Sequence, residues 1–413
     1  MWRSRGWRLS KKRSVRFSAR WGIDMAQKEI HFGVIGCGLM GREFASAAAR
    51  WCHLLDLDFR PVITAACDVV EPAREWFRSA VPSVRLVTDD YHRLLDDPSI
   101  DAIYCAVPHN QHADLYVEIL EAGKHLLGEK PFGIDLPANQ AILQAVQAHP
   151  GCLARCSSEF PFTPGAYRIA QWMRQGAFGR IIEMEAGFWH SSDLDPTKPI
   201  NWKRRIATNG EYGCMGDLGV HVAHLPLRAG WKPVNVRGLL SKIIAQRPDG
   251  KGGLAACETW DNATLACEAE VGDQASGGQR FPMTLSFKRI APGHGDTWFV
   301  RIWGTELSVE FTTQNPKQLR TLPYQPGGPQ EWRVLDLPYK SAYPTITGSI
   351  FEFGFSDSIL QMWAAFCDEL THGQEGMRQP FYCATPAETA FTHLLFTAAL
   401  RSQAEESTVA LQK

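Results

Sequence analysis

The sequence predicts two domains: an α/β domain with a doubly wound parallel sheet, then an α+β domain with a large open-faced, mainly antiparallel sheet. The chain has 413 residues, more than one ordinary domain contains. Up to about residue 158, short apolar runs alternate with helical patterns. Beyond that point, apolar runs follow one another with Gly- and Pro-rich turns between them, as antiparallel strands do.

Alternating strands and helices in the first half imply a parallel sheet that helices cover on both faces. The expected strands are Ile30–Ile35, Pro61–Cys67, Ala102–Val107, His125–Gly128 and Cys152–Ser157. The expected helices are Leu39–Trp51, Pro72–Ser79, Gln111–Ala122 and Leu136–Ala148.

The second half is expected to be mostly strand, with two helices at its end. The expected strands are Ile181–Trp189, Val234–Ile244, Ala263–Val271, Met283–Lys288, Trp298–Trp303 and Leu307–Phe311. The two helical patterns are Ile359–Leu370 and Pro386–Ser402. We assign residues 1–28 to a leader, 29–158 to the first domain and 159–413 to the second. The C-terminal helix is expected to pack back on the first domain.

Composition excludes several classes of protein. The formal net charge is −1, so no overall charge favours nucleic acid or an anionic membrane. No apolar stretch approaches the length of a membrane span. The 11 cysteines are scattered without a Cys-x-x-Cys pair, which favours free thiols and a cytoplasmic location. Residues 1–22 are basic and carry no acid, so they fit a disordered or artefactual leader, with Met25 the true start, or a transit peptide.

A glycine motif joins the first expected strand to the first expected helix. Gly36 permits a tight turn, Gly38 lets a pyrophosphate approach the backbone, and Gly41 allows close helix–strand contact. The helix that begins at Leu39 and Met40 supplies free amides and a positive dipole end to the anion. The motif predicts dinucleotide binding, with a plain strand–turn–helix as the alternative.

An acidic residue at the end of the second strand is expected to hold the adenosine ribose. Asp68 has that position, 27 residues after Gly41. Asp56 and Asp58 are nearer to the usual spacing, but they precede the strand. No basic residue directly follows Asp68, as a 2′-phosphate would require, so NAD is favoured over NADP.

The fourth expected strand ends in Glu129-Lys130-Pro131, where an open parallel sheet has its ligand crevice. A lysine there can contact a substrate hydroxyl beside the nicotinamide and act in acid–base chemistry. The alternative is a solvated lysine before a proline turn.

With these motifs, the chain resembles the Gfo/Idh/MocA family, which includes glucose–fructose oxidoreductase and inositol dehydrogenase. The resemblance extends from about residue 29 to 405. It rests on the ordered set of the glycine motif, Val107-Pro108-His109-Asn110-Gln111-His112, Ala122-Gly123-Lys124-His125 with Glu129-Lys130-Pro131, Gly176-Ala177-Phe178-Gly179-Arg180-Ile181, and Gly216-Asp217-Leu218-Gly219-Val220-His221. The resemblance implies a Rossmann domain followed by an open-faced sheet, with substrate between them.

The resemblance also implies roles for single residues. The family's catalytic lysine corresponds to Lys130, and its Asp-x-x-x-His pair to Asp217 and His221. On a helix that spacing places both side chains on one face, so Asp217 could orient His221 or bind a substrate hydroxyl. His221 suits proton abstraction as the hydride leaves. The cofactor contacts implied beyond the glycine turn are Val107, Pro108, His112, Glu129, Lys130 and Trp202, with His109 either beside them or in solvent.

Two departures from the family pattern affect the substrate side. His224 stands where many relatives carry an acid, and Lys203 stands where many carry an arginine after Trp202. We expect substrate contacts from Lys130, His190, Asp217, His221 and His224. Asp217, His221 and His224 also resemble a metal cluster, but hydride transfer requires none, and we expect no metal.

These residues together predict an NAD-dependent dehydrogenase that transfers a hydride at a secondary alcohol or ketone of a sugar, cyclitol or related polyol. One alternative is an NAD-dependent glycosidase or lyase that oxidises its sugar transiently. Another is a dinucleotide-binding regulatory protein without chemistry. The resemblance further implies a homo-oligomer, either a dimer or a tetramer, through the open sheet. Neither the substrate nor the reaction direction follows from the sequence.

Overall fold

A computed structural model describes residues 27–272, 278–337 and 341–411. Residues 1–26 of the expected leader therefore lie outside the described part. The first sheet has six parallel strands in the order β3-β2-β1-β4-β5-β6. These strands are β1 Lys28–Ile35, β2 Phe59–Cys67, β3 Leu86–Thr88, β4 Ala102–Cys105, β5 His125–Gly128 and β6 Ala154–Cys156.

Helices connect these strands, and their bounds follow the expected pattern closely. They are α1 Leu39–Ala49, α2 Glu71–Ala80, α3 His92–Leu95, α4 His112–Glu121 and α5 Leu136–Ala148. Helix α5 begins where expected because Asp135 caps it, accepting a hydrogen bond from the Ala138 amide at 2.8 Å. Strand β3 has only three residues, too few to show a pattern, and the sequence analysis missed it.

The second sheet has ten strands in the order β17-β16-β15-β14-β7-β13-β12-β9-β18, with β8 also paired to β12. β7 and β13 are parallel, and the other pairs are antiparallel. The strands are β7 Ile181–Trp189, β8 Trp231–Pro233, β9 Asn235–Ser241, β12 Asn262–Val271, β13 Arg280–Lys288, β14 Thr297–Gly304, β15 Leu307–Thr312, β16 Gln318–Pro323, β17 Arg333–Asp336 and β18 Val409–Ala410. A separate exposed hairpin joins β10 Gln246–Pro248 to β11 Leu254–Ala256.

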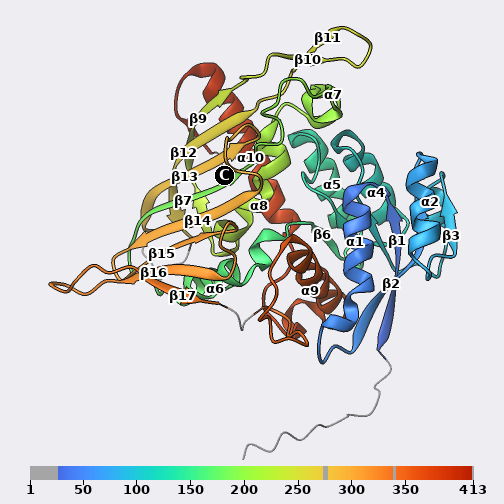
Figure 1. Cartoon of the computed structure of the whole chain (residues 1–413), viewed down its shortest axis with the longest axis horizontal. Coiled ribbons are helices and arrows are strands. Elements are labelled where there is room, and N and C mark those ends of the chain that lie inside the picture. Colours follow the sequence, from blue (N-terminus) through green and yellow to red (C-terminus); the bar gives the residue numbers. More distant parts are fainter. Residues whose placement is uncertain (1–26, 273–277, 338–340, 412–413) are drawn as a thin grey trace, which may run out of the picture.

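Three helices pack against the large sheet (Figure 1). They are α6 Pro164–Arg174, α8 Cys214–Arg228 and α10 Pro386–Glu405; the short helix α7 Ile206–Asn209 lies near α8. Helix α8 is buried along nearly its whole length, and the sequence analysis identified only its Asp217/His221 spacing.

Helix α9, Phe355–Gly376, returns to the first domain although it follows the second sheet (Figure 1). Its Trp363 is fully buried, with its ring beside those of Phe32 from β1, Phe44 from α1 and Tyr104 from β4. After α10, strand β18 pairs with β9 of the large sheet. The C-terminal part of the chain therefore covers the first sheet and extends the second.

All 11 cysteines are free thiols. Within the described ranges, we find no helix with the length and apolar character that crossing a membrane requires.

Candidate active site

A cavity of about 850 Å³ lies between the two domains, above the carboxyl ends of the first sheet's strands. Its dinucleotide side is lined by Gly36, Gly38, Leu39, Met40 and Asp68. Val107 and Pro108, which follow β4, and Glu129 and Lys130, which follow β5, also line it. The cavity joins residues from many separate segments of the chain, and the glycine turn lines part of it.

The glycine turn has the geometry that a bound pyrophosphate requires. Gly36 has a φ of +97°, and an added Cβ would lie 2.3 Å from the Ala106 carbonyl oxygen. A Cβ at Gly41 would lie 2.2 Å from the Gly36 carbonyl oxygen, so this glycine lets α1 pack against the turn. At Gly38 a Cβ would meet nothing within 4 Å, because this glycine faces open space. Helix α1 has no side-chain cap and no acid in its first turn, so its amides and dipole remain available to an anion.

Asp68 stands at the end of β2 and lines the same cavity. Its carboxylate accepts hydrogen bonds from the amides of Cys37 and Val70, both at 2.8 Å. The neighbouring Val69 is 83% exposed and carries no charge. Asp68 is therefore held where a ribose diol would lie, and its charge opposes a 2′-phosphate. These residues fit a bound NAD.

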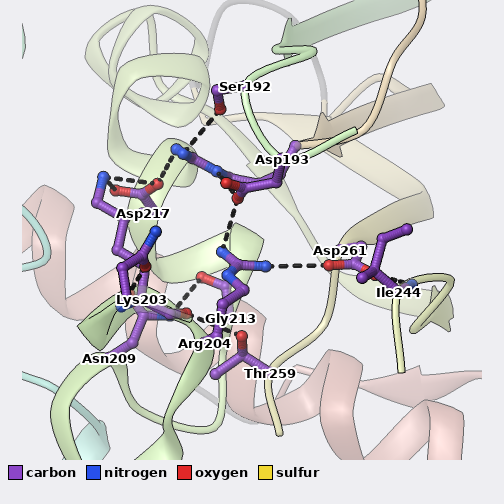
Figure 2. Close-up of polar contacts among 12 residues, drawn as sticks. Ser192, Asp193, Lys203, Arg204, Asn209, Gly213, Asp217, Ile244, Thr259 and Asp261 are labelled. Atoms are coloured by element: carbon purple, nitrogen blue, oxygen red, sulfur yellow. Dashed lines mark hydrogen bonds and ion pairs between the residues drawn. The ribbon is translucent and has the colours of Figure 1, made fainter. Parts of the chain in front are cut away.

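Asp217, near the start of α8, is the centre of the substrate side. Lys130 donates to its main-chain oxygen at 2.6 Å and to its carboxylate at 2.9 Å. Lys203 bonds both carboxylate oxygens, at 2.9 and 3.2 Å, and Figure 2 shows the two side chains facing each other. Arg289, which follows β13, donates to the second oxygen. One buried carboxylate thus holds three cations.

These charges shift each other's proton affinity. Burial favours a neutral Asp217, but the three cations outweigh it and hold its pKa well below the usual value. Burial also opposes the charge on Lys130, yet Asp217 and Glu129 raise its pKa overall. Lys203 differs, because burial and repulsion from Arg289 and Lys130 outweigh Asp217 and lower its pKa to about 8. Lys130 therefore remains an ammonium and donates its hydrogen bonds to Asp217.

A chain of ion pairs continues from Arg289 to residues beyond the Asp217 cluster. Arg289 also donates to Asp193 at 2.9 Å, and Arg204 lies 3.2 Å from the same carboxylate. Arg204 then donates to Asp261 at 3.0 Å, the arrangement that Figure 2 shows. Both Arg204 and Asp261 are fully buried. Such a network positions Arg289 and Asp217 firmly, since each buried charge has a partner.

His221 lies one turn after Asp217 on α8 and lines the cavity, but Asp217 does not orient it. The oxygens of Asp217 bond the three cations, whereas His221 Nδ1 lies 3.7 Å from the Glu159 carboxylate. The rings of Phe160 and Phe188 meet the imidazole at 86°, at 5.3 and 5.6 Å. Burial and then Lys130 lower the pKa of His221 well below its usual value, so the ring is neutral.

The structure also places His190, Trp202 and His109 on the cavity wall. His190 Nδ1 lies 2.9 Å from the Gly295 carbonyl oxygen, and burial lowers its pKa to about 4, with Arg289 contributing. The ring of Trp202 meets that of His109 edge-on at 4.8 Å. His109 is buried rather than solvated at the helix start.

Three predicted site residues lie outside the cavity lining: Gly41, His112 and His224. His112 Nδ1 lies 2.7 Å from the Pro131 carbonyl oxygen and Nε2 lies 2.9 Å from that of Val107, so its ring supports the loops on both sides. His224 accepts from Arg228 at 3.0 Å and stacks on Phe381. The substrate contact expected of His224 therefore stays a prediction, although its side chain lies outside the cavity lining.

The metal alternative has no support in the described residues, which hold no cluster of three or more potential metal ligands. Lys130, Lys203 and Arg289 occupy the Asp217 carboxylate, and Arg228 faces His224.

Sequence reasoning missed Arg289 and Glu159. Glu159 did carry a signal, because it follows β6 as Glu129 follows β5, and residues after parallel strands line the crevice. Arg289 carried none, since it resembles any charged residue at the end of an antiparallel strand.

A parallel dinucleotide fold that shares a cavity with a second domain, lined by a lysine, a histidine and a buried carboxylate, is typical of an NAD-dependent oxidoreductase. Comparisons with known proteins agree. Residues 30–155 match the family model described as "Oxidoreductase family, NAD-binding Rossmann fold", and residues 167–310 match the "GFO/IDH/MocA C-terminal domain". The chain belongs to the Gfo/Idh/MocA family. The predicted fold, family, NAD cofactor and enzyme class, a dehydrogenase acting on CH–OH groups, are thereby confirmed.

Individual relatives are more distant. The levoglucosan dehydrogenase of Pseudarthrobacter phenanthrenivorans is 26% identical over 305 residues, which cover 71% of this chain and 76% of that protein. A solved levoglucosan dehydrogenase in complex with NADH and levoglucosan has a TM-score of 0.80 at 22% identity, over 94% of this chain and all of that one. Glycosyl hydrolase family 109 protein 1 of Bacteroides thetaiotaomicron is 28% identical over 186 residues, covering 42% of this chain and 38% of that protein.

Proposed function

We propose that this protein oxidises a secondary alcohol of a sugar or polyol with NAD, or reduces the matching ketone. The observation that carries the proposal is the shared cavity, in which the dinucleotide turn, Lys130 and His221 line one continuous space. Levoglucosan dehydrogenase, similar along most of the chain, supports the substrate class. Asp68 with its uncharged neighbour Val69 supports NAD rather than NADP.

When bound, the nicotinamide accepts or returns the hydride. The residues of the chain handle the substrate oxygen and its proton. Lys130, held as an ammonium by Asp217, donates a hydrogen bond to the substrate oxygen and stabilises negative charge that develops there. His221 is neutral and takes the hydroxyl proton. Trp202 and Phe160 offer flat apolar surfaces for the sugar ring.

The test is a panel of sugars, anhydrosugars and polyols with NAD or NADP, followed by NADH absorbance at neutral and alkaline pH. We expect NAD to bind in the absence of sugar and at least one panel member to give net NADH. Failure to bind either dinucleotide would overturn the proposal at its first step.

A second candidate is a glycosidase or lyase that oxidises its sugar transiently and recovers the cofactor. The partial similarity to a glycosyl hydrolase family 109 protein supports this second candidate. Product analysis separates the two: a dehydrogenase accumulates NADH with turnover, whereas the lyase releases a leaving group without net NADH.

The large sheet also supports a proposal of a homodimer or homotetramer. Ile182 of β7 and Leu239 of β9 expose apolar side chains that a second copy could cover. Light scattering after gel filtration tests this, and a monomeric mass would refute it.

A further inference from the structure

Glu159 is an acidic side chain of the cavity that the proposed chemistry leaves without a role. Glu159 lies just after β6, lines the cavity and is 3% exposed. Its Oε2 has no hydrogen-bond partner in the described structure, and neither has Nδ1 of His221. These two unpartnered buried atoms lie 3.7 Å apart. Two orphaned polar atoms that face each other are unusual, because burial of such groups without partners is costly.

Other contacts fix the position of the His221 side chain relative to Glu159. Phe160, next to Glu159, and Phe188 of β7 pack edge-on against the imidazole, so its ring plane is fixed. Trp298 of β14 donates to the main-chain oxygen of His221 at 2.9 Å. With Nδ1 toward Glu159, Nε2 is the ring nitrogen left for a substrate. A small closure of the cavity would bring Glu159 and Nδ1 within hydrogen-bond distance.

We propose that Glu159 is a positioning residue for His221, binding its Nδ1 edge and taking on the proton that the imidazole passes along. This inference rests on the proposed dehydrogenase. In oxidation, the hydroxyl O–H bond breaks and its proton joins Nε2, while the Nδ1 proton moves to the Glu159 carboxylate. The electron pair of the C–H bond leaves as the hydride, so a neutral ketone and a neutral imidazole remain.

The ionisation of Glu159 sets which ring nitrogen is free. As a carboxylate it accepts Nδ1–H, so Nε2 has a lone pair for the substrate proton. As a neutral acid it donates to Nδ1, so Nε2 carries the hydrogen and serves reduction instead. Burial, and then Glu129, raise the pKa of Glu159 to about 8, close to the working range.

Charges from every neighbouring element face this pair. Glu129 after β5 and Asp296 before β14 raise the pKa of Glu159, and Lys130 lowers it. On the other side, Lys130, His190 and His224 lower the pKa of His221, whereas Asp217 raises it. The charged groups that face Glu159 are two acids and one cation. Their net negative charge helps to keep the pKa of Glu159 above its usual value, so this side chain can take up a proton near neutral pH.

The kinetic test compares Glu159→Gln and Glu159→Asp with the wild type. In the wild type, we expect kcat for oxidation to rise about tenfold as the pH increases through 8. In Glu159→Gln, we expect kcat to be about 10–100-fold lower and to lack this rise with pH, while KM is nearly unchanged. Glu159→Asp should keep the step at a reduced rate. Glu352→Gln is a matched control, because Glu352 also faces a histidine, His53, but lies outside the cavity. An unchanged pH profile in Glu159→Gln would overturn the inference.

A second measurement does not depend on turnover. In NAD-loaded protein with 15N-labelled histidines, the His221 signals, identified with His221→Asn, should change tautomer near pH 8. Glu159→Gln should abolish that change. If the tautomer change is absent from the wild type, the inference fails even where a sugar is oxidised. If the tautomer change is present but no alcohol is oxidised, the pairing of Glu159 with His221 stands and only the proposed function fails.

Discussion

Lys130 donates to both the main-chain oxygen and the carboxylate of Asp217, at 2.6 and 2.9 Å, although 87 residues separate them in the sequence. The contact joins the end of β5 in the first domain to the start of α8 in the second. It therefore holds the lysine in the cavity lining and keeps it charged. The proposed mechanism and two of the predictions below depend on this contact.

Lys130→Ala should lower turnover by about 10²–10⁴-fold, because it removes the donor to the substrate oxygen. Binding of NAD, measured by fluorescence titration, should change by less than about threefold. Lys251→Ala, in an exposed turn, is the control. Turnover at the wild-type rate would show that Lys130 has another role.

Asp217→Asn should destabilise the fold as well as lower turnover, because three cations lose their shared carboxylate. Loss of one partner from a buried ion pair costs about 3–5 kcal/mol. Adding Lys203→Met should recover part of that stability by removing one excess cation. Urea unfolding of both variants measures this, and equal stability of Asp217→Asn and the wild type would contradict the network described above.

Two glycines of one turn should respond differently to alanine. Gly36→Ala should destabilise the domain, since its φ of +97° and its contact with the Ala106 carbonyl exclude a Cβ. Gly38→Ala should unfold like the wild type, because its Cβ meets open space, but should weaken NAD binding at least about tenfold. Melting curves and NAD titrations together separate the two effects. Normal NAD affinity in Gly38→Ala would mean that the pyrophosphate lies elsewhere.

Asp68 should decide between the two dinucleotides. Asp68→Ala should weaken NAD by about 1–3 kcal/mol, as expected for lost hydrogen bonds to a charged group. Asp68→Ser combined with Val69→Arg should improve NADP relative to NAD, because the change removes a negative charge and adds a positive one. The ratio of kcat/KM for NAD and NADP is the measurement. A wild type that prefers NADP would refute the assignment.

Trp363→Ala should destabilise the dinucleotide domain by about 3–5 kcal/mol, although Trp363 lies more than 200 residues after that domain's last strand. Its indole is fully buried against Phe44 of α1 and Phe32 of β1. Thermal unfolding monitored with and without NAD should show the loss. A chain cut before α9 should likewise fail to bind NAD, and retention of binding would contradict this account.

Local patterns allowed much of the fold and part of the site to be predicted. The helix at Leu136–Ala148 was predicted to the residue, and the glycine motif identified the cofactor turn. Short elements such as β3 were not predicted, since three residues show no periodicity. His224 lies outside the cavity lining, which spacing along a helix could not show, because Arg228 and Phe381 face that side chain.

The sequence by itself determined the alternation of strands and helices in the first domain, the dinucleotide turn and the lysine after β5, because each depends on residues close together in the chain. Only the tertiary structure decided what surrounds the reacting groups. It brought Lys203 and Arg289 to Asp217, turned His221 toward Glu159 and placed α9 on the first sheet. These contacts join residues that are distant in sequence, and their charge and burial exist only once the two domains enclose the cavity.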